Sequence, residues 1–332
     1  MSKKRALESF FTPASQKKAR SDRAPSDSTA LTPVCQHTTD HPTSTHSTYP
    51  HPVPHLPPHI QAALSEIPAS EGRQINDQPD LDLLYFQPFI PSGIENELFR
   101  FLRKELFFYR VKYKIKRGGF ETDISTPRYT TVFGVDQTSK FEPSASTLVD
   151  TKSSKPVPPD RYDCTPRPLP QCLDALRCIT EVFTNSEYNF CLVNYYASGS
   201  DSISYHSDDE RFLGAMPSIA SFSLGAKRDF CMKHKPVPPG NDAKDNISDK
   251  PLKLPLGSGD MVLMRGTTQA NWLHSIPKRS GKGTQEGRIN ITFRKALVKG
   301  GTENYYRYNV GDGGVWRWDE GTKEMKERKN GS

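Results

Sequence analysis

Residues 202–212 read SISYHSDDERF, with a histidine and an aspartate one residue apart and further acidic residues directly behind them. Successive side chains of a β-strand point to opposite faces, so a strand here places His206 and Asp208 on one face and Ser207 on the other. An imidazole and a carboxylate aimed at one point can form a surface ion pair, a catalytic acid–base pair or two ligands of one metal ion. The rest of the sequence must decide between these interpretations.

Short predicted strands surround this stretch. They alternate with turns, and we expect them at 189–197, 202–208, 218–226, 228–235, 252–264, 272–279 and 288–297. Earlier in the chain we expect two amphipathic helices, at 93–106 and 170–183, with strands between them at 108–119 and 127–135. Early helices followed by many short strands favour a mainly β fold, a sandwich or jelly roll with flanking helices packed outside.

The composition indicates that part of the chain is not packed. Only 34% of the 332 residues are hydrophobic and 28 are prolines, which is unusual for a wholly globular protein. Residues 35–61, CQHTTDHPTSTHSTYPHPVPHLPPHIQ, have almost no apolar periodicity and cannot offset the entropy of folding. We therefore expect a disordered tail over 1–75, a folded domain over 76–300 with a polar insertion at 235–251, and a C-terminal extension over 301–332.

Charge and cysteine usage limit the class of protein. The net charge of +7 fits an anionic partner such as nucleic acid without requiring one. The six cysteines are scattered and include no C-x-x-C pair, so we expect reduced thiols rather than a disulfide framework or a zinc site. No apolar run approaches the length of a membrane span and no hydrophobic segment begins the chain, which predicts a soluble intracellular protein.

The extreme N-terminus carries a possible docking peptide. Leu7, Phe10 and Phe11 have the i, i+3, i+4 spacing of one helical face, and such a stripe in a polar tail is typical of a helix that binds in a groove. It resembles the sliding-clamp-binding motif of replication and repair proteins, with Lys4 where that motif has a glutamine. A chance apolar cluster is the alternative. Basic runs at 3–5 and 16–20 are consistent with a nuclear-import signal.

The metal interpretation of His206 and Asp208 needs a third ligand. Six of the nine histidines lie in the expected tail, at His37, His41, His46, His51, His55 and His59. In the body, His234 is flanked by lysines at the edge of the polar insertion, where we expect a solvated side chain. His274 follows Trp272 and Leu273 on a predicted strand. Together His206, Asp208 and His274 make two imidazoles and one carboxylate, the facial arrangement that holds non-heme Fe(II) with open positions.

A second pattern lies on the strand at 288–294. One face carries Arg288, Asn290, Thr292 and Arg294, and the other carries Ile289, Ile291 and Phe293. Guanidinium groups that face inward need anionic partners, because an unpaired buried charge is very costly. A dicarboxylate near the metal would satisfy them, and Asn194 and Tyr196 share a face of the neighbouring strand. A purely structural salt-bridge network is the alternative.

Four ordered blocks carry a resemblance to a known family. LVNYYASGSDSISYHSDDERFLG (192–214), SIASFSLGAKRDFCMKHK (218–235), LGSGDMVLMRGTTQANWLHSIPK (256–278) and RINITFRK (288–295) resemble the AlkB family of Fe(II)/2-oxoglutarate dioxygenases. The similarity covers about residues 80–300 and is greatest to the eukaryotic members that repair alkylated DNA. It implies a double-stranded β-helix (jelly roll) core, with His206, Asp208 and His274 as iron ligands. It also implies that 2-oxoglutarate is held by Asn194, Tyr196, Arg288, Asn290, Thr292 and Arg294.

The resemblance also implies substrate contacts. Asp209 matches an acidic position that contacts the target base, and Arg128 matches a block on the substrate side. The aromatic residue that stacks on the base in the family is replaced by a polar insertion, so Tyr162, and after it Phe141, are candidates for that ring, although both could simply pack. Residues 112–122, KYKIKRGGFET, correspond to the element that probes the duplex, and their basic character favours phosphate contact.

The expected function is therefore oxidative demethylation of N1-methyladenine and N3-methylcytosine in DNA by a nuclear, monomeric enzyme that uses Fe(II), 2-oxoglutarate and O2. One alternative keeps the iron chemistry and changes the substrate to RNA or protein. The other is a non-catalytic nucleic-acid-binding protein tethered to the clamp. The aromatic and basic stretch at 305–318 could stack on bases or form an additional packed β-element.

Overall fold

The computed structural model describes residues 42–328, apart from 69, 118, 143–146, 238–250, 282, 284 and 311–313. The candidate clamp-binding residues Leu7, Phe10 and Phe11 and most of the polar insertion lie outside the described residues. Among the helices that are described, none is long and apolar enough to cross a membrane.

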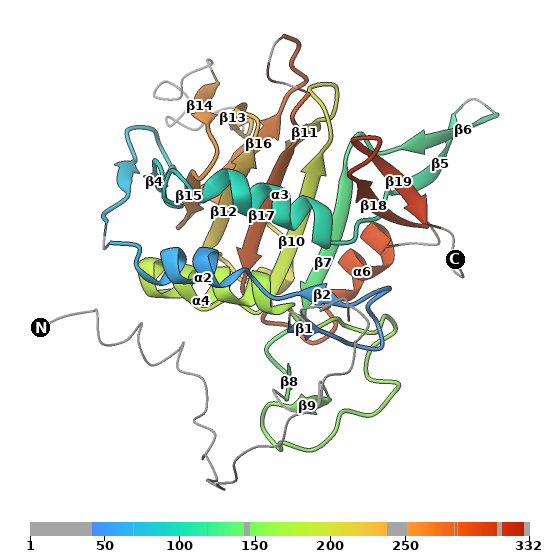
Figure 1. The fold of residues 1–332 in the computed structure, drawn as a ribbon. Helices are drawn as coiled ribbons and strands as arrows, with labels where there is room; N and C mark the ends of the chain where they lie inside the picture. The colour runs from blue at the N-terminus through green and yellow to red at the C-terminus, as the bar shows by residue number, and fades with distance from the viewer. Residues whose placement is uncertain are drawn as a thin grey trace, which may run out of the picture. The chain divides into compact units, whose positions relative to one another are not determined.

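Two antiparallel sheets form the centre of the folded part (Figure 1). The larger has seven strands in the order β3 (Arg73–Ile75), β4 (Leu83–Phe86), β15 (Met261–Met264), β12 (Ile219–Gly225), β17 (Arg288–Arg294), β10 (Phe190–Tyr196) and β7 (Tyr129–Gly134). The smaller has four, in the order β11 (Ile203–His206), β16 (Trp272–Ile276), β13 (Arg228–His234) and β14 (Leu252–Leu256). The prediction of a mainly β, jelly-roll fold with flanking helices is confirmed.

Each sheet face has its own apolar cluster. Between the two sheets, residues such as Phe190 and Ile219 of the larger sheet pack with Phe230 and Trp272 of the smaller one. On the other face of the larger sheet, Ile289, Ile291 and Phe293 of β17 are buried with residues from the helices. The alternation expected for 288–294 is therefore confirmed, and it turns the polar side chains of β17 toward the space between the sheets.

Helices α3 (Glu95–Glu105) and α4 (Gln171–Thr184) lie over the outer face of the larger sheet (Figure 1). Leu98 and Leu102 of α3, and Leu173 and Leu176 of α4, are buried on the side that faces the sheet. Asn185 ends α4 in the left-handed conformation, which asparagine tolerates well. Both helices predicted from the sequence are confirmed.

The prediction of disorder up to residue 75 is wrong for residues 43–68. These residues form β1 (Thr43–Ser44), β2 (Val53–Pro54) and α2 (Pro58–Ser65), and α2 packs against α4. Their few apolar side chains are almost all buried in the helical cluster, namely Tyr49, Val53, Leu56, Ile60, Leu64 and Ile67. Prolines suit this segment because it is mostly extended and its helix begins with proline, where no backbone N–H is needed.

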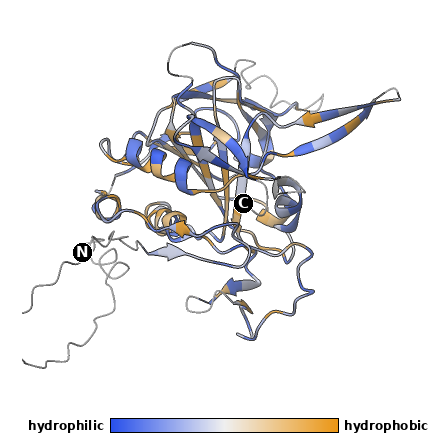
Figure 2. Cartoon of the chain, turned by 45° about the vertical axis from the view of Figure 1, so that its right-hand side comes forward, coloured by the Kyte–Doolittle hydropathy of each residue, from blue (hydrophilic) through white to orange (hydrophobic). Residues whose placement is uncertain are grey.

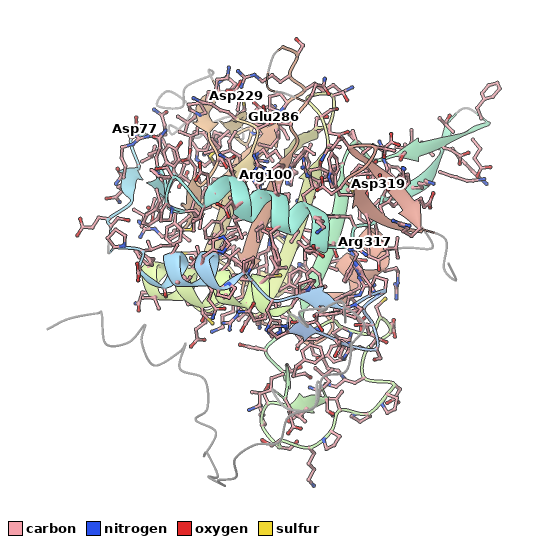
Figure 3. The ribbon with its side chains drawn as sticks, in the orientation of Figure 1. Asp77, Arg100, Asp229, Glu286, Arg317 and Asp319 are labelled. Carbon is pink, nitrogen blue, oxygen red and sulfur yellow. The ribbon has the colours of Figure 1, made fainter. Side chains whose placement is uncertain are left out.

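The C-terminal extension is folded onto the body. It contains α6 (Glu303–Val310) and a hairpin of β18 (Val315–Asp319) and β19 (Glu324–Arg328). The backbones of Trp316 and Phe108 exchange two hydrogen bonds, and the guanidinium of Arg103 lies 3.8 Å over the Trp318 ring. Figure 3 shows Arg317 of β18 beside the end of α3. The packed β-element considered for 305–318 is thus present, and it is preceded by a helix.

Two other hairpins leave the central sheets. β5 (Lys112–Arg117) and β6 (Phe120–Ser125) project away from the body (Figures 1 and 2), and Phe120 near the tip is 79% exposed. Gly119 takes a φ of +84° at the turn, which glycine alone adopts easily. β8 (Ser139–Phe141) and β9 (Leu148–Asp150) form a small separate hairpin. The described cysteines are all free thiols.

Candidate active site

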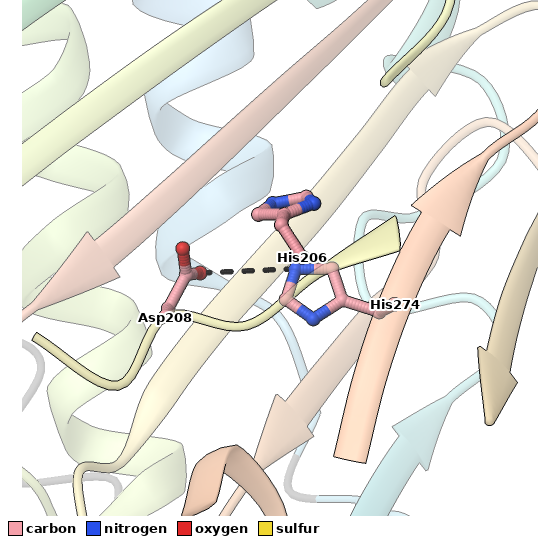
Figure 4. Close-up of side chains that lie close together, drawn as sticks. All are labelled: His206, Asp208 and His274. Atoms are coloured by element: carbon pink, nitrogen blue, oxygen red, sulfur yellow. Dashed lines mark ion pairs between the residues drawn. The ribbon is translucent and has the colours of Figure 1, made fainter. Parts of the chain in front are cut away.

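His206, Asp208 and His274 converge between the two sheets (Figure 4). β11 pairs with β16 so that His206 lies opposite His274, and the two ring centroids are 4.3 Å apart. One donor atom from each of the three side chains lies within 4.8 Å of the others, and no second group of this kind occurs in the described part of the chain. β11 ends at His206, so Asp208 lies in the following loop and not, as expected, on the strand.

Hydrogen bonds and burial keep the three groups in the form that binds a metal. Nδ1 of His206 lies 2.9 Å from the carbonyl oxygen of Ser204. A proton on Nδ1 that donates to this oxygen leaves the lone pair of Nε2 free to bind a metal ion. Burial, followed by the neighbouring His206 ring, lowers the pKa of His274 to about 3, so its imidazole is neutral. Burial raises the pKa of Asp208, but the Arg294 guanidinium and the two imidazoles lower it by more, so the group is a carboxylate.

Arg294 is committed to this cluster. Its Nη2 donates to the Asp208 carboxylate at 2.8 Å and its Nη1 donates to the Tyr305 hydroxyl at 2.5 Å. The Tyr305 hydroxyl in turn donates to Glu210. Although burial disfavours its charge, the acidic groups around Arg294 raise its pKa further, so it stays protonated. Arg294 therefore fixes the orientation of Asp208 and ties α6 to the site.

Arg288 at the other end of β17 lacks such a partner. It is 1% exposed and its Nη2 donates to the Ser223 hydroxyl at 2.7 Å, but its Nε and Nη1 make no hydrogen bond. Its guanidinium carbon lies 5.4 Å from the centroid of the Tyr196 ring. Burial lowers the pKa of Arg288 to about 10, which still leaves it charged at neutral pH. A buried cation with open donors is a site built for an anion.

One cavity of about 470 Å³ connects these groups. It is lined by the His–Asp–His cluster and by all six residues implied to hold 2-oxoglutarate, namely Asn194, Tyr196, Arg288, Asn290, Thr292 and Arg294. Arg128 lines it as well and donates through Nε to the Asn194 side chain at 3.2 Å. The volume is within the range of small-molecule sites in proteins.

The structure does not bring the other substrate candidates into this cavity. Asp209 is exposed and its carboxylate bonds to the Lys235 ammonium at 2.6 Å, outside the cavity. Tyr162 is buried elsewhere, with its hydroxyl donating to Ser139, and Phe141 packs edge-on against His46. His234 is not solvated as expected, because its side chain is 6% exposed and packs against Trp272.

Sequence reasoning missed several cavity residues. Glu210 lines the cavity, and its Oε2 is buried without a hydrogen-bond partner. It lies two residues beyond Asp208, in the loop after β11, where strand alternation gives no indication of which way a side chain points. Asn304, Tyr305 and Tyr308 line the cavity from α6. Their spacing at i, i+1 and i+4 is that of one helical face, but the sequence between 301 and 310 did not indicate which element it would cover.

Comparisons with known proteins agree with this geometry. The model of the 2OG-Fe(II) oxygenase superfamily matches residues 82–294. The DNA oxidative demethylase ALKBH2 of Arabidopsis thaliana is 33% identical over 249 residues, which cover 70% of this chain and 73% of that protein. The alpha-ketoglutarate-dependent dioxygenase alkB homolog 3 of Homo sapiens is 41% identical over 133 residues, 39% of this chain and 45% of that protein. Human ALKBH2 is 37% identical over 137 residues, 40% of this chain and 49% of that protein.

Proposed function

The chain belongs to the 2OG-Fe(II) oxygenase superfamily and to the AlkB family within it, and from this membership we propose that it repairs DNA by removing alkyl groups from damaged bases. It is a dioxygenase that uses Fe(II), 2-oxoglutarate and O2. When bound, these cofactors hydroxylate an N-alkyl carbon while 2-oxoglutarate leaves as succinate and carbon dioxide, and the hydroxylated N-methyl group then departs as formaldehyde. The observation that carries the proposal is the convergence of His206, Asp208 and His274 in a cavity that also contains Arg288.

We assign the iron to His206, Asp208 and His274. Two imidazoles and one carboxylate suit a borderline divalent ion; Nε2 of His274 lies 3.9 Å from the Asp208 carboxylate, and the Nδ1 contact of His206 leaves its Nε2 free. Arg294 holds Asp208 through one guanidinium nitrogen, which orients the carboxylate before any ion arrives. This hydrogen bond leaves the carboxylate ionised, as a ligand must be.

We assign 2-oxoglutarate to the part of the cavity around Arg288. A carboxylate accepting from Nε and Nη1 would satisfy both of its open donors in the bidentate geometry that guanidinium prefers. Asn194, Tyr196, Asn290 and Thr292 line the same part of the cavity and would fix the orientation of the cosubstrate. Both Nη atoms of Arg294 are occupied by Asp208 and Tyr305, which leaves it one open donor, Nε; we assign the diacid to Arg288, which has two.

We place the alkylated base in the part of the cavity beyond Arg288 and the metal cluster. The target nucleotide has to leave the base stack to reach a buried site, which costs least when alkylation has already destroyed its pairing face. N1-methyladenine and N3-methylcytosine have lost that face and carry positive charge, so the open Glu210 oxygen is complementary to them. Asp209, implied by the family resemblance, would serve a base only after releasing Lys235.

The β5–β6 hairpin supports DNA as the substrate. Lys112, Lys114 and Lys116 are exposed along β5, where they can neutralise phosphates. Phe120 near the tip exposes a ring that can contact bases. We further propose that the protein is a monomer that works in the nucleus, with Leu7, Phe10 and Phe11 as the tether to the sliding clamp. Loss of co-precipitation with the clamp after changing Phe10 and Phe11 to alanine would support that tether.

The proposed function is tested with the full chain, Fe(II), ascorbate and 2-oxoglutarate on oligonucleotides that carry one N1-methyladenine or N3-methylcytosine. We expect mass spectrometry to show loss of the mass of one methylene group, and we expect His206→Ala to abolish it. Matched single-stranded DNA, duplex DNA and RNA establish the preferred nucleic acid. A difference in metal binding between wild type and His206→Ala would show that the metal site of the wild type is intact. With that control in place, absence of iron-dependent turnover on all of these substrates would refute the proposal.

A further inference from the structure

Helix α6, which lies beyond the residues matched by the family model, forms one wall of the active-site cavity. Resting on the proposed function, we infer that Tyr308 of this helix is the aromatic side chain that stacks on the extruded alkylated base. The base-stacking ring would then come from the C-terminal extension and not from the polar insertion that contains Tyr162 and Phe141.

Helix α6 is held rigidly against the site. The Tyr305 hydroxyl bonds to Arg294 and to Glu210, and the Tyr305 ring packs edge-on against Phe190 at 5.2 Å. The Tyr306 hydroxyl donates to the carbonyl oxygen of Gly134 in β7 at 2.6 Å. Two consecutive tyrosines thus anchor the helix at both the cluster and the larger sheet, so the wall is preformed before substrate binds.

Tyr308 lies at the mouth of this cavity. It follows Tyr305 by three positions and therefore projects from the same side of the helix. It lines the cavity, yet 49% of its surface is exposed, which places its ring where the cavity opens to solvent. An exposed ring at the mouth of a polar cavity offers a face on which a base can stack.

The other aromatic residues of the cavity wall are not available for stacking. Tyr196, Phe212 and Phe230 are buried in the cluster between the sheets. The Tyr305 ring is enclosed by Phe190 and Phe212, and its hydroxyl is occupied. Of the tyrosine and phenylalanine residues found to line the cavity in the described part of the chain, Tyr308 has the exposed ring.

Tyr308 also joins the cavity to the projecting hairpin. Its ring centroid is 6.4 Å from that of Tyr113 on β5, and Tyr113 is itself 40% exposed. By the strand register Phe120 lies on the same face of the hairpin as Tyr113, whereas Lys112, Lys114 and Lys116 lie on the other face. A strand that contacts the Phe120 face of this hairpin would therefore pass Tyr113 and Tyr308 as its target nucleotide turns into the cavity.

The test uses a single-stranded oligonucleotide with one ethenoadenine, a fluorescent alkylated base, and compares wild type with Tyr308→Phe and Tyr308→Leu. Titration into metal-free protein reports binding and stacking without turnover, because contact with an aromatic ring quenches the probe. We expect Tyr308→Phe to match wild type. We expect Tyr308→Leu, which keeps apolar bulk but removes the ring, to bind about tenfold more weakly and to lose the quenching.

Controls separate this inference from the proposed function. Both variants should keep the thermal midpoint and the 2-oxoglutarate affinity of wild type, since Tyr308 is half exposed and contacts neither Arg288 nor the metal cluster. If wild type turns over methylated oligonucleotides and Tyr308→Leu binds and quenches equally well, the role of Tyr308 is refuted while the function stands. The role of Tyr308 would also be refuted if a fluorescent base next to the alkylated base were quenched while the alkylated base itself was not. If wild type turns over no alkylated nucleic acid, the proposed function is refuted, and the role of Tyr308 that rests on it is refuted as well.

Discussion

Replacing Arg288 by methionine should stabilise the cofactor-free protein while abolishing its response to 2-oxoglutarate. Arg288 is buried, donates one hydrogen bond to Ser223 and has two nitrogens without partners. Burial lowers its pKa from 12.5 to about 10, which corresponds to a cost of about 3 kcal/mol for holding the charge inside the fold. Methionine removes that cost and loses a hydrogen bond worth about 1 kcal/mol, so we expect a net gain of about 1–3 kcal/mol.

Arg228 provides the matched control. It is as deeply buried as Arg288 and also lies near Tyr196, but both of its Nη atoms donate to backbone carbonyls, of Ser198, Asp201 and Pro277, which leaves only its Nε without a partner. Arg228→Met would leave these three carbonyl oxygens without the guanidinium hydrogen-bond donor. The same substitution at this site should therefore lower the free energy of unfolding by about 2–4 kcal/mol.

Urea unfolding of the metal-free proteins measures both effects. Added 2-oxoglutarate, with Mn²⁺ in place of iron to prevent turnover, should raise the free energy of unfolding of wild type by about 2.7 kcal/mol at a hundredfold excess over Kd. Arg288→Met should show no such rise. If Arg288→Met is destabilised as much as Arg228→Met, or still responds to 2-oxoglutarate, the reasoning that Arg288 is kept open for an anion is wrong.

Three further predictions concern stability. Tyr305→Phe should lower the free energy of unfolding by about 2–4 kcal/mol, because Arg294 and Glu210 both lose a buried partner; an unchanged urea midpoint would contradict this. Leu64→Ala on α2 should cost about 2–5 kcal/mol in the same assay, whereas a disordered tail would show no effect. Burial lowers the pKa of His51 to about 4 from 6.5, so the unfolded chain binds the proton first and stability should fall as the pH drops from about 6.5 toward 4. His51→Phe should reduce the slope of that part of a calorimetric pH series, with His274 still contributing, and an unaltered slope would rule out His51 as a source.

Local sequence patterns predicted the elements and much of the site. The period of apolar residues located α3, α4 and most strands, since a two-residue or helical period follows from backbone geometry alone. Counting the histidines outside the expected tail left His206 and His274 beside Asp208, and these three side chains converge. The alternation along 288–294 correctly divided β17 into a core face and a face toward the cavity.

Patterns of apolar residues failed where packing came from distant parts of the chain. Residues 43–68 look disordered by composition, but almost all of their few apolar side chains are buried in the cluster that the helices form with the larger sheet. Composition reports the average tendency to bury surface and does not report whether a complementary surface exists elsewhere. Tertiary packing therefore determines that the segment containing α2 is folded.

The tertiary structure likewise determined which partner each charged residue of the site finds. The sequence by itself determined that β17 carries two arginines on one face, that His206 and Asp208 are close, and that residues 305–308 are aromatic. Only the folded chain turned Asp209 toward Lys235 and brought Tyr305 to Arg294, which left Arg288 with two open donors in the cavity. The physical reason is that periodicity specifies the face on which a side chain lies, whereas its partner is set by whichever segment packs over that face.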